Sequence, residues 1–351
     1  MVIYDELIEL DMELAEGAVL LNIETTGLSP RSAFIYMIGM GWQEGHGIQT
    51  RCFLAESRMD ERKLMESFHE SLSRFKRIIT FGGQSFSWRF MTSRWTNYGD
   101  DDLFAGKSME DIQKNITPYK AAFALTDLKK YTVEDFIGFR RHSNQSGKDL
   151  MAVFSEWERN HDEGSRSCIL AHHRDDMYSL LHLSLLSAYT DFWNGNFKRV
   201  ISWQLKDDVC IFRLLLYRPV TQALHYQTEY CIIDLKDQEA RIHMPVYQGE
   251  LKYFFPGPVK DYYYLPSEDQ AVHHSVARYV DKVFRKRATA ATCYTRKAGI
   301  FLPTDDSHIQ PHFQEEYHSK DYYILYDPES WTDNPDLLNR YLSSCIKQLP
   351  Q

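Results

Sequence analysis

A short apolar segment near the N-terminus carries two polar side chains, and it limits what the chain can fold into more than any other feature. Residues 18–24 read Ala-Val-Leu-Leu-Asn-Ile-Glu, and Thr-Thr-Gly follows. Side chains two positions apart in a β-strand point to the same face of a sheet, so Asn22 and Glu24 are expected to lie together at the end of a buried strand. Burying polar groups costs free energy unless they have partners. The pattern therefore predicts a functional cluster where this strand ends.

The segments that follow predict an α/β order for residues 18–188. Short connections that contain Gly or Pro favour antiparallel neighbours for three expected strands, at residues 18–24, 33–42 and 48–54. Apolar residues at helical spacing and a further strand pattern predict a helix within 59–75, a strand at 77–81, and helices at 85–95 and 173–188. Strands that alternate with helices in this way are typical of an α/β domain.

The pattern changes near residue 195. Two pairs of strand-like segments flank polar turns, at residues 200–205 with 209–217 and at 229–235 with 240–246. Ser267 and Gln270 form a capping-box pattern that predicts a helix over about residues 268–290. We therefore expect an N-terminal extension at residues 1–17, an α/β domain at 18–192 and a β-rich α+β domain at 193–351.

Composition excludes several classes of protein. With 351 residues of which 43% are hydrophobic, the chain is expected to be globular and not disordered. Its six cysteines include no CxxC pair, which favours reduced thiols in a cytoplasmic protein over a disulfide framework or a zinc site. We expect no signal peptide, because no basic segment precedes an apolar one at the N-terminus. No apolar run reaches the roughly 20 residues of a membrane helix.

Three short motifs occur within residues 18–187. Residues 22–27 read Asn-Ile-Glu-Thr-Thr-Gly, residues 81–87 read Phe-Gly-Gly-Gln-Ser-Phe-Ser, and residues 172–177 read His-His-Arg-Asp-Asp-Met. In this order they resemble the YprB-type ribonuclease H-like domains, which are relatives of the DEDD-type proofreading 3′-5′ exonucleases. That family reads Asp-Ile-Glu-Thr-Thr-Gly, Phe-Asn-Gly-x-Ser-Phe-Asp and His-Asn-x-x-Asp-Ile in the three places. The resemblance implies a mixed sheet flanked by helices.

The resemblance also implies a pair of Mg²⁺ or Mn²⁺ ions held by four carboxylates. Matched position by position, Glu24 and Asp176 keep the acid, whereas Asn22 and Ser87 replace two aspartates. Asp175 is a partial substitute as a metal ligand. With half of the acids missing, we expect weak or single-ion binding, or no metal at all.

A histidine near the third motif is the expected water-activating group. His172 precedes Asp176 by four residues and so shares a helix face with it, and the resemblance implies that it orients or deprotonates the attacking water. His173 is the alternative, and a locally bonded histidine without a catalytic role is another. Asp176 could instead cap the N-terminus of the last helix, and Glu24 could be a buried acid in a degenerate site.

Glycines and a basic segment complete the candidate site. We expect Gly27 and Gly82 to be turn glycines with positive φ, while Gly83 either makes a plain turn or lets a substrate backbone approach. The predicted helix at 268–290 carries cations at helical spacing that could follow a phosphate backbone or face solvent; they are Arg278, Lys282 and Arg285.

Three functions remain open from the sequence. The favoured one is an exonuclease-family nucleic-acid-binding protein, with a single-stranded DNA or RNA end as its partner and with catalysis weakened or lost. The alternatives are an active two-metal exonuclease and a protein–protein interaction module built on a degenerate nuclease fold.

Overall fold

The structure is a computed structural model that describes residues 1–9, 13–99, 101–143, 145–304, 306 and 308–349. The chain divides into two compact units, Met1–Ser187 and Ala188–Gln351. The first unit ends five residues before the domain boundary that the sequence predicts.

A six-stranded mixed sheet forms the centre of the first unit, with strand order β1-β4-β3-β2-β5-β6. The pairs among β1, β4, β3 and β2 are antiparallel, whereas β5 is parallel to both β2 and β6. The strands are β1 (Val2–Glu9), β2 (Ala18–Thr25), β3 (Ile35–Glu44), β4 (Gly47–Leu54), β5 (Arg77–Thr80) and β6 (Ser108–Asp111). Three of these antiparallel strands are the ones that short turns predicted.

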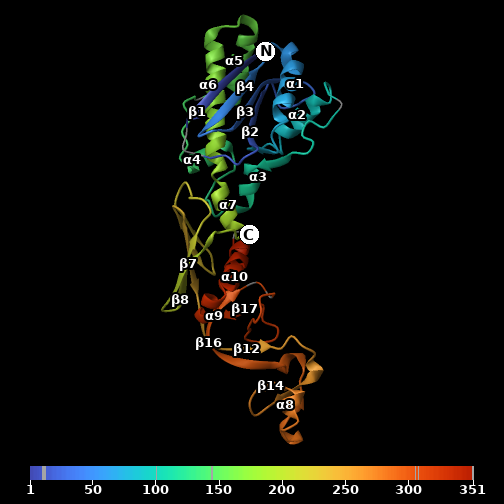
Figure 1. The fold of residues 1–351 in the computed structure, drawn as a ribbon, viewed down its shortest axis with the longest axis vertical. Helices are drawn as coiled ribbons and strands as arrows, with labels where there is room; N and C mark the ends of the chain where they lie inside the picture. Colours follow the sequence, from blue (N-terminus) through green and yellow to red (C-terminus); the bar gives the residue numbers. More distant parts are fainter. Residues whose placement is uncertain (10–12, 100, 144, 305, 307, 350–351) are drawn as a thin grey trace. The chain divides into compact units, whose positions relative to one another are not determined.

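Helices cover this sheet, with α1 and α2 on one side and α5 and α6 on the other (Figure 1). The apolar stripe of α1 is buried as its spacing predicted. The helices are α1 (Glu61–Leu72), α2 (Ser87–Trp95), α3 (Ile112–Ile116), α4 (Lys130–Phe136), α5 (Gly147–Asn160) and α6 (Glu163–Ser184). The α/β class and the mixed sheet flanked by helices are therefore confirmed.

Two expectations about the first unit are wrong. The expected N-terminal extension belongs to the sheet at residues 2–9, because β1 pairs with β4 from Val2 opposite Leu54 to Glu9 opposite Gly47 and so covers an otherwise open sheet edge. The expected helix at 173–188 is α6, which begins ten residues earlier at an N-cap, Asp162, whose side chain accepts from Ser165 N. Asp176 lies inside this helix and cannot cap its N-terminus.

The second unit is rich in strands, as predicted. A five-stranded antiparallel sheet has the order β7-β8-β11-β10-β9, and two three-stranded sheets have the orders β12-β16-β17 and β14-β13-β15. One face of the five-stranded sheet packs against α9 and α10, where the Phe212 ring lies close to Trp331 and Tyr341. The larger strands are β7 (Arg199–Lys206), β8 (Val209–Leu215), β9 (Leu224–Gln227), β10 (Ile232–Lys236), β11 (Glu239–Pro245), β12 (Tyr247–Phe254) and β16 (Tyr294–Thr304). The remaining elements are α7 (Ser187–Trp193), β13 (Tyr262–Leu265), β14 (Gln270–His273), α8 (His274–Ala277), β15 (Lys286–Arg287), β17 (Tyr322–Leu325), α9 (Pro328–Asp333) and α10 (Pro335–Gln348).

The continuous basic helix predicted at 268–290 does not form. Its first residues are strand β14, a single helical turn, α8, follows, and residues 286–287 are strand β15. The aromatic strand β13 explains this outcome, because it takes β14 and β15 as hydrogen-bonded neighbours on its two sides. Strand pairing therefore overrides the helical spacing of the charges. The apolar side chains at that spacing, such as Tyr279 and Phe284, stay exposed and so do not stabilise a helix by burial.

Two other expectations concern the whole chain. All six cysteines are free thiols, and Cys52, Cys210, Cys231 and Cys293 are buried. None of the helices in the described residues combines the length and the apolar character needed to cross a bilayer.

Candidate functional site

The site begins at the end of β2, on the sheet face that α6 covers. Asn22 pairs with Gly39 of β3, so the Asn22 side chain and the open position above Gly39 lie on the same face of the sheet. A Cβ on Gly39 would lie only 2.7 Å from His173 Nδ1, so the glycine lets α6 approach the sheet closely. This close approach brings the middle of α6 over the polar end of β2.

Four of the predicted positions converge there. Candidate ligand atoms of Glu24, His172 and Asp176 all lie within 4.8 Å of one another. His172 Nε2 is 3.3 Å from Asp176 Oδ2 and 3.8 Å from Glu24 Oε1. Asn22 Nδ2 donates a hydrogen bond to the same Asp176 Oδ2 at 2.8 Å. Asn22 and Glu24, two residues apart on β2, thus lie beside His172 and Asp176, four residues apart on α6, as the sequence indicated.

Two cations to which the sequence analysis gave no role in the site complete the cluster. Lys130 Nζ lies 2.7 Å from Asp176 Oδ1, and Arg141 Nη2 donates to the same oxygen at 2.8 Å. Arg141 also forms two hydrogen bonds, of 2.9 Å and 2.7 Å, with the buried carboxylate of Glu134, which accepts a further bond from the Ser179 hydroxyl. The sequence contained one indication of this charged cluster, because Lys130 and Glu134 are four residues apart and so share one face of α4.

The protonation states follow from these contacts. Burial alone would raise the pKa of Asp176, but Lys130, His172 and Arg141 hold this pKa well below its usual value. Burial alone would lower the pKa of His172, but the carboxylates of Asp176 and Glu24 raise it to about 9. Burial raises the pKa of Glu24, and the neighbouring His172 opposes this shift. At neutral pH Asp176 is therefore ionised and His172 is protonated.

This arrangement does not fit a pair of divalent ions. Two such ions repel each other unless anionic oxygens surround them. Both carboxylate oxygens of Asp176 already accept hydrogen bonds, and Asn22 turns its amide N–H toward one of them. Three cationic side chains offset the carboxylates of Glu24, Glu134 and Asp176; they are Lys130, Arg141 and protonated His172. The cluster has no surplus of negative charge for metal ions.

Other predicted residues have different surroundings. Asp175 is not part of the cluster, and its carboxylate accepts from His142 N at 2.9 Å and Ser143 N at 2.6 Å. His173 is fully buried and its pKa falls to about 4, so it is neutral and removed from water. Ser87 is a buried residue in the first turn of α2, and its hydroxyl has no hydrogen bond to the cluster in the described structure.

The glycines have structural roles. Gly82 has φ of +72°, as predicted, whereas Gly27 is not among the glycines with positive φ, so that expectation is wrong. A Cβ on Gly83 would lie 2.5 Å from Trp88 Nε1, so side-chain packing requires this glycine. The turn is held by Asp111, whose carboxylate accepts from Gly82 N at 2.8 Å and Gln84 N at 2.9 Å.

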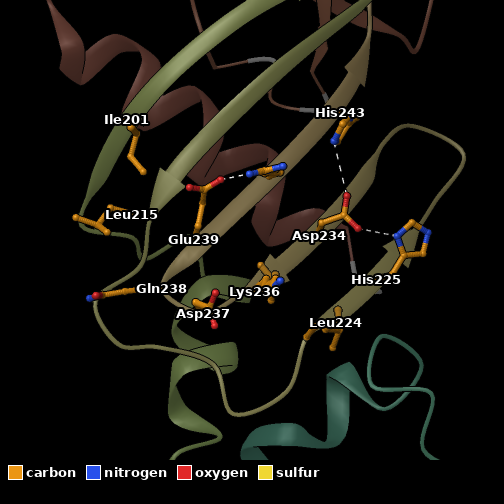
Figure 2. A pocket seen from close by; sticks show the side chains of 13 residues that line it. Ile201, Leu215, Leu224, His225, Asp234, Lys236, Asp237, Gln238, Glu239 and His243 are labelled. Atoms are coloured by element: carbon orange, nitrogen blue, oxygen red, sulfur yellow. Dashed lines mark hydrogen bonds and ion pairs between the residues drawn. The ribbon is translucent and has the colours of Figure 1, made fainter.

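The second unit contains a hollow of about 900 Å³ that the sequence analysis did not predict. Figure 2 shows Asp234 between two histidines, with His225 Nδ1 at 2.7 Å and His243 Nε2 at 3.7 Å. Glu239, on the same side of the sheet, pairs with Arg213 at 2.6 Å and with Arg241 at 2.7 Å. Asp234 and Glu239 are thus paired with basic neighbours, and strand alternation explains why these residues share one face.

Comparison with known proteins agrees with the fold of the first unit. Residues 19–186 match the model of the RNase H superfamily. No match was found among curated proteins. An RNase H superfamily domain therefore occupies residues 19–186.

Solved structures with partial similarity include polymerase and exonuclease chains. A family B DNA polymerase from the hyperthermophilic archaeon Pyrobaculum calidifontis is 14% identical, with a TM-score of 0.39, over 71% of this chain and 38% of that chain. A structure of exonuclease I is 10% identical, with a TM-score of 0.31, over 80% of this chain and 64% of that chain. The zinc-bound complex of E. coli exonuclease I with single-stranded DNA is 9% identical, with a TM-score of 0.31, over 95% of this chain and 74% of that chain. TM-scores this low do not support the assignment of an activity to this chain.

Proposed function

We propose that this chain is a cytoplasmic nucleic-acid-binding protein of the exonuclease-type, YprB-like group, in which phosphodiester hydrolysis is weak or lost. The observation that supports this proposal is the set of partners around Asp176. Asn22, Lys130 and Arg141 all donate to its carboxylate. An acid that would have to coordinate ions is instead neutralised by the protein itself.

Electrostatics explains how binding can persist without cleavage. A nuclease of this kind uses metal ions to generate the nucleophile and to stabilise the leaving oxygen. Here Lys130 is partly exposed, with 23% of its side chain accessible, so its charge can attract a phosphate. Attraction of a phosphate by a fixed ammonium group does not produce a hydroxide nucleophile. The cluster around Asp176 therefore supports recognition better than hydrolysis.

An active exonuclease, with one ion in place of two, remains the second candidate, because one observation favours it. Glu24, His172 and Asp176 are the one group of His, Cys, Asp and Glu side chains in the described residues whose atoms are close enough to hold an ion. A single weakly held Mg²⁺ or Mn²⁺ at this group would fit the two acids that the chain retains.

Binding and cleavage measured on the same samples test the proposal. We expect 5′-labelled single-stranded DNA or RNA to bind the full chain equally well in EDTA and in Mn²⁺, with no shortened products. Calorimetric titration with Mn²⁺ is expected to show no two-ion binding. Two tightly bound ions together with cleavage would establish the active exonuclease, and absence of any nucleic-acid binding would favour a protein interaction module.

The Lys130→Ala variant tests whether the cluster around Asp176 makes the contact. We expect weaker binding and a smaller salt dependence, because one cation that can neutralise a phosphate is removed. Lys129→Ala is a matched control, since Lys129 is the adjacent, more exposed lysine and pairs only with Asp127 at 3.3 Å. Equal losses in both variants would show that the contact is not specific to the cluster.

A further inference from the structure

A short segment of the second unit carries positive charge that the described protein leaves unpaired. Residues 273–287, which we call the basic tip, contain five cations: Arg278, Lys282, Arg285, Lys286 and Arg287. None of these five forms an ion pair with a described carboxylate. The acid within the tip, Asp281, accepts a hydrogen bond from Val283 N and so stabilises the local turn. Five uncompensated cations in ten residues are unusual for a chain with a net charge of −9.

The same segment exposes large apolar side chains. Tyr279 is 77% exposed, Phe284 is 61% exposed and Val283 is 82% exposed, and Val276 also faces solvent. Apolar groups of this size gain free energy when a partner covers them. The tip therefore offers aromatic rings and cations side by side.

Local contacts hold the tip in one conformation. The ring of Tyr263 on β13 has the guanidinium carbons of Arg285 and Arg287 at 5.0 Å and 4.5 Å from its centroid. Arg285 also donates to the carbonyl oxygen of Ala277, which ties the end of α8 to the strand that follows. Figure 1 shows α8 beside β14, and both contact β13. A partner would meet a preformed surface, so it would not have to order this segment.

We propose that the basic tip binds single-stranded nucleic acid, with the cations on phosphates and bases stacked on Tyr279 and Phe284. Rings and cations alternate along the tip, as in Arg278-Tyr279 and Phe284-Arg285, and a single strand likewise alternates flat bases with charged phosphates. An RNase H superfamily domain in the same chain favours a nucleic acid over an anionic membrane as the partner. This inference deepens the proposed function by adding a contact surface outside the cluster around Asp176.

Equilibrium binding of the full chain to fluorescein-labelled dT20 and rU20 in EDTA, measured at several NaCl concentrations, tests the tip. The Tyr279→Ala, Phe284→Ala double variant is expected to bind roughly tenfold more weakly or worse, because each stacked base is lost. The Arg278→Ala, Lys282→Ala, Lys286→Ala variant is expected to lower the slope of log affinity against log salt by about 2. All these side chains are exposed, so both variants are expected to keep the folded state, and circular dichroism checks this.

Matched controls come from the same unit. Tyr217 and Tyr230 are also more than half exposed, so the Tyr217→Ala, Tyr230→Ala variant removes two exposed rings elsewhere. Lys206→Ala with Lys236→Ala removes two exposed lysines. We expect both controls to bind within about twofold of the unchanged chain. Tip variants that bind like the controls overturn the proposal.

Two further arms separate the possible failures. If Lys130→Ala weakens binding while the tip variants do not, the cluster around Asp176 makes the contact, and the tip inference alone is wrong. If the unchanged chain binds neither dT20 nor rU20, the proposed function fails as well. Vesicles containing phosphatidylglycerol form the last arm, and tip-dependent binding to them without tip-dependent binding to dT20 or rU20 would assign the tip to a membrane instead.

Discussion

The buried cluster around Asp176 in the first unit and the basic tip of the second unit differ in how their charges are paired. In the cluster, Asp176 is only 4% exposed and accepts from Asn22, Lys130 and Arg141. In the tip, cations such as Lys282 and Lys286 are exposed and have no described acid as a partner. Burial makes an unpaired charge very costly, whereas water solvates an exposed one. A buried cluster must therefore satisfy itself, and an exposed one stays available to an external partner.

Removal of Arg141 is expected to have the largest effect on stability. Arg141→Ala leaves Glu134 and Asp176 buried with fewer partners, and loss of one member of a buried ion pair costs about 3–5 kcal/mol. Urea unfolding followed by fluorescence measures this change. The adjacent Arg140→Ala is the control, because its ion pair with Asp135 is exposed and is expected to contribute less than about 1 kcal/mol. Similar losses in the two variants would contradict the distinction between buried and exposed pairs.

Restoring the missing acids tests whether lost charge explains weak catalysis. We expect the Asn22→Asp, Ser87→Asp variant to raise Mn²⁺-dependent cleavage of labelled single-stranded DNA by roughly 100-fold, the size of effect that one well-placed electrostatic group has on a rate. The exposed residues Asn97 and Ser93 provide the control Asn97→Asp, Ser93→Asp, which adds the same charge on α2 and in the turn that follows it. Cleavage that stays absent in the restored variant would show that the motifs are aligned wrongly or that Lys130 and Arg141 block the site.

The paired charges of the cluster also predict how stability depends on pH. The folded-state pKa of His172 is about 9, above its usual value of 6.5. A raised pKa stabilises the fold fully below pH 6.5, and this contribution is lost as the pH rises through 9, at up to about 1.4 kcal/mol per pH unit. We expect urea unfolding to show lower stability at pH 9 than at pH 6.5, and His172→Gln to reduce this difference. An unchanged difference in the variant would exclude His172 as its source.

The depressed pKa of Asp176 affects stability at the acidic end of the pH range. Its contribution to the free energy of unfolding is present above the usual pKa of 3.8 and is lost as the pH falls through the folded-state pKa.

The smallest expected effect is at the tip. Lys282→Ala is expected to change the free energy of unfolding by less than about 0.5 kcal/mol, because Lys282 is exposed and has no described ion-pair partner. A thermal melt of the variant beside the unchanged chain measures this. A loss of more than 1 kcal/mol would mean that the tip cations stabilise the fold, and the contrast with the cluster would fail.

Much of the first unit was predictable, because its signals are local and repeat with the period of the element. Alternation in β2 placed Asn22 and Glu24 on one face, and helical spacing placed His172 near Asp176. The start of α6 was missed because its first five residues, Glu-Gly-Ser-Arg-Ser, carry no apolar side chain, and β1 was missed because it is mostly exposed. The predicted basic helix failed because β13 recruits strand partners from both sides, which no spacing within residues 268–290 reveals.

The sequence by itself determined which side chains are available at the site, including the amide and the hydroxyl that replace two acids. Only the tertiary structure decided that Lys130 and Arg141 reach Asp176, since these residues are 46 and 35 positions away along the chain. Coulomb interactions depend on distance and burial, and neither quantity is encoded in local periodicity. Whether a carboxylate is free for a metal ion or already neutralised is therefore decided by the packing of α4 and α6 against the sheet.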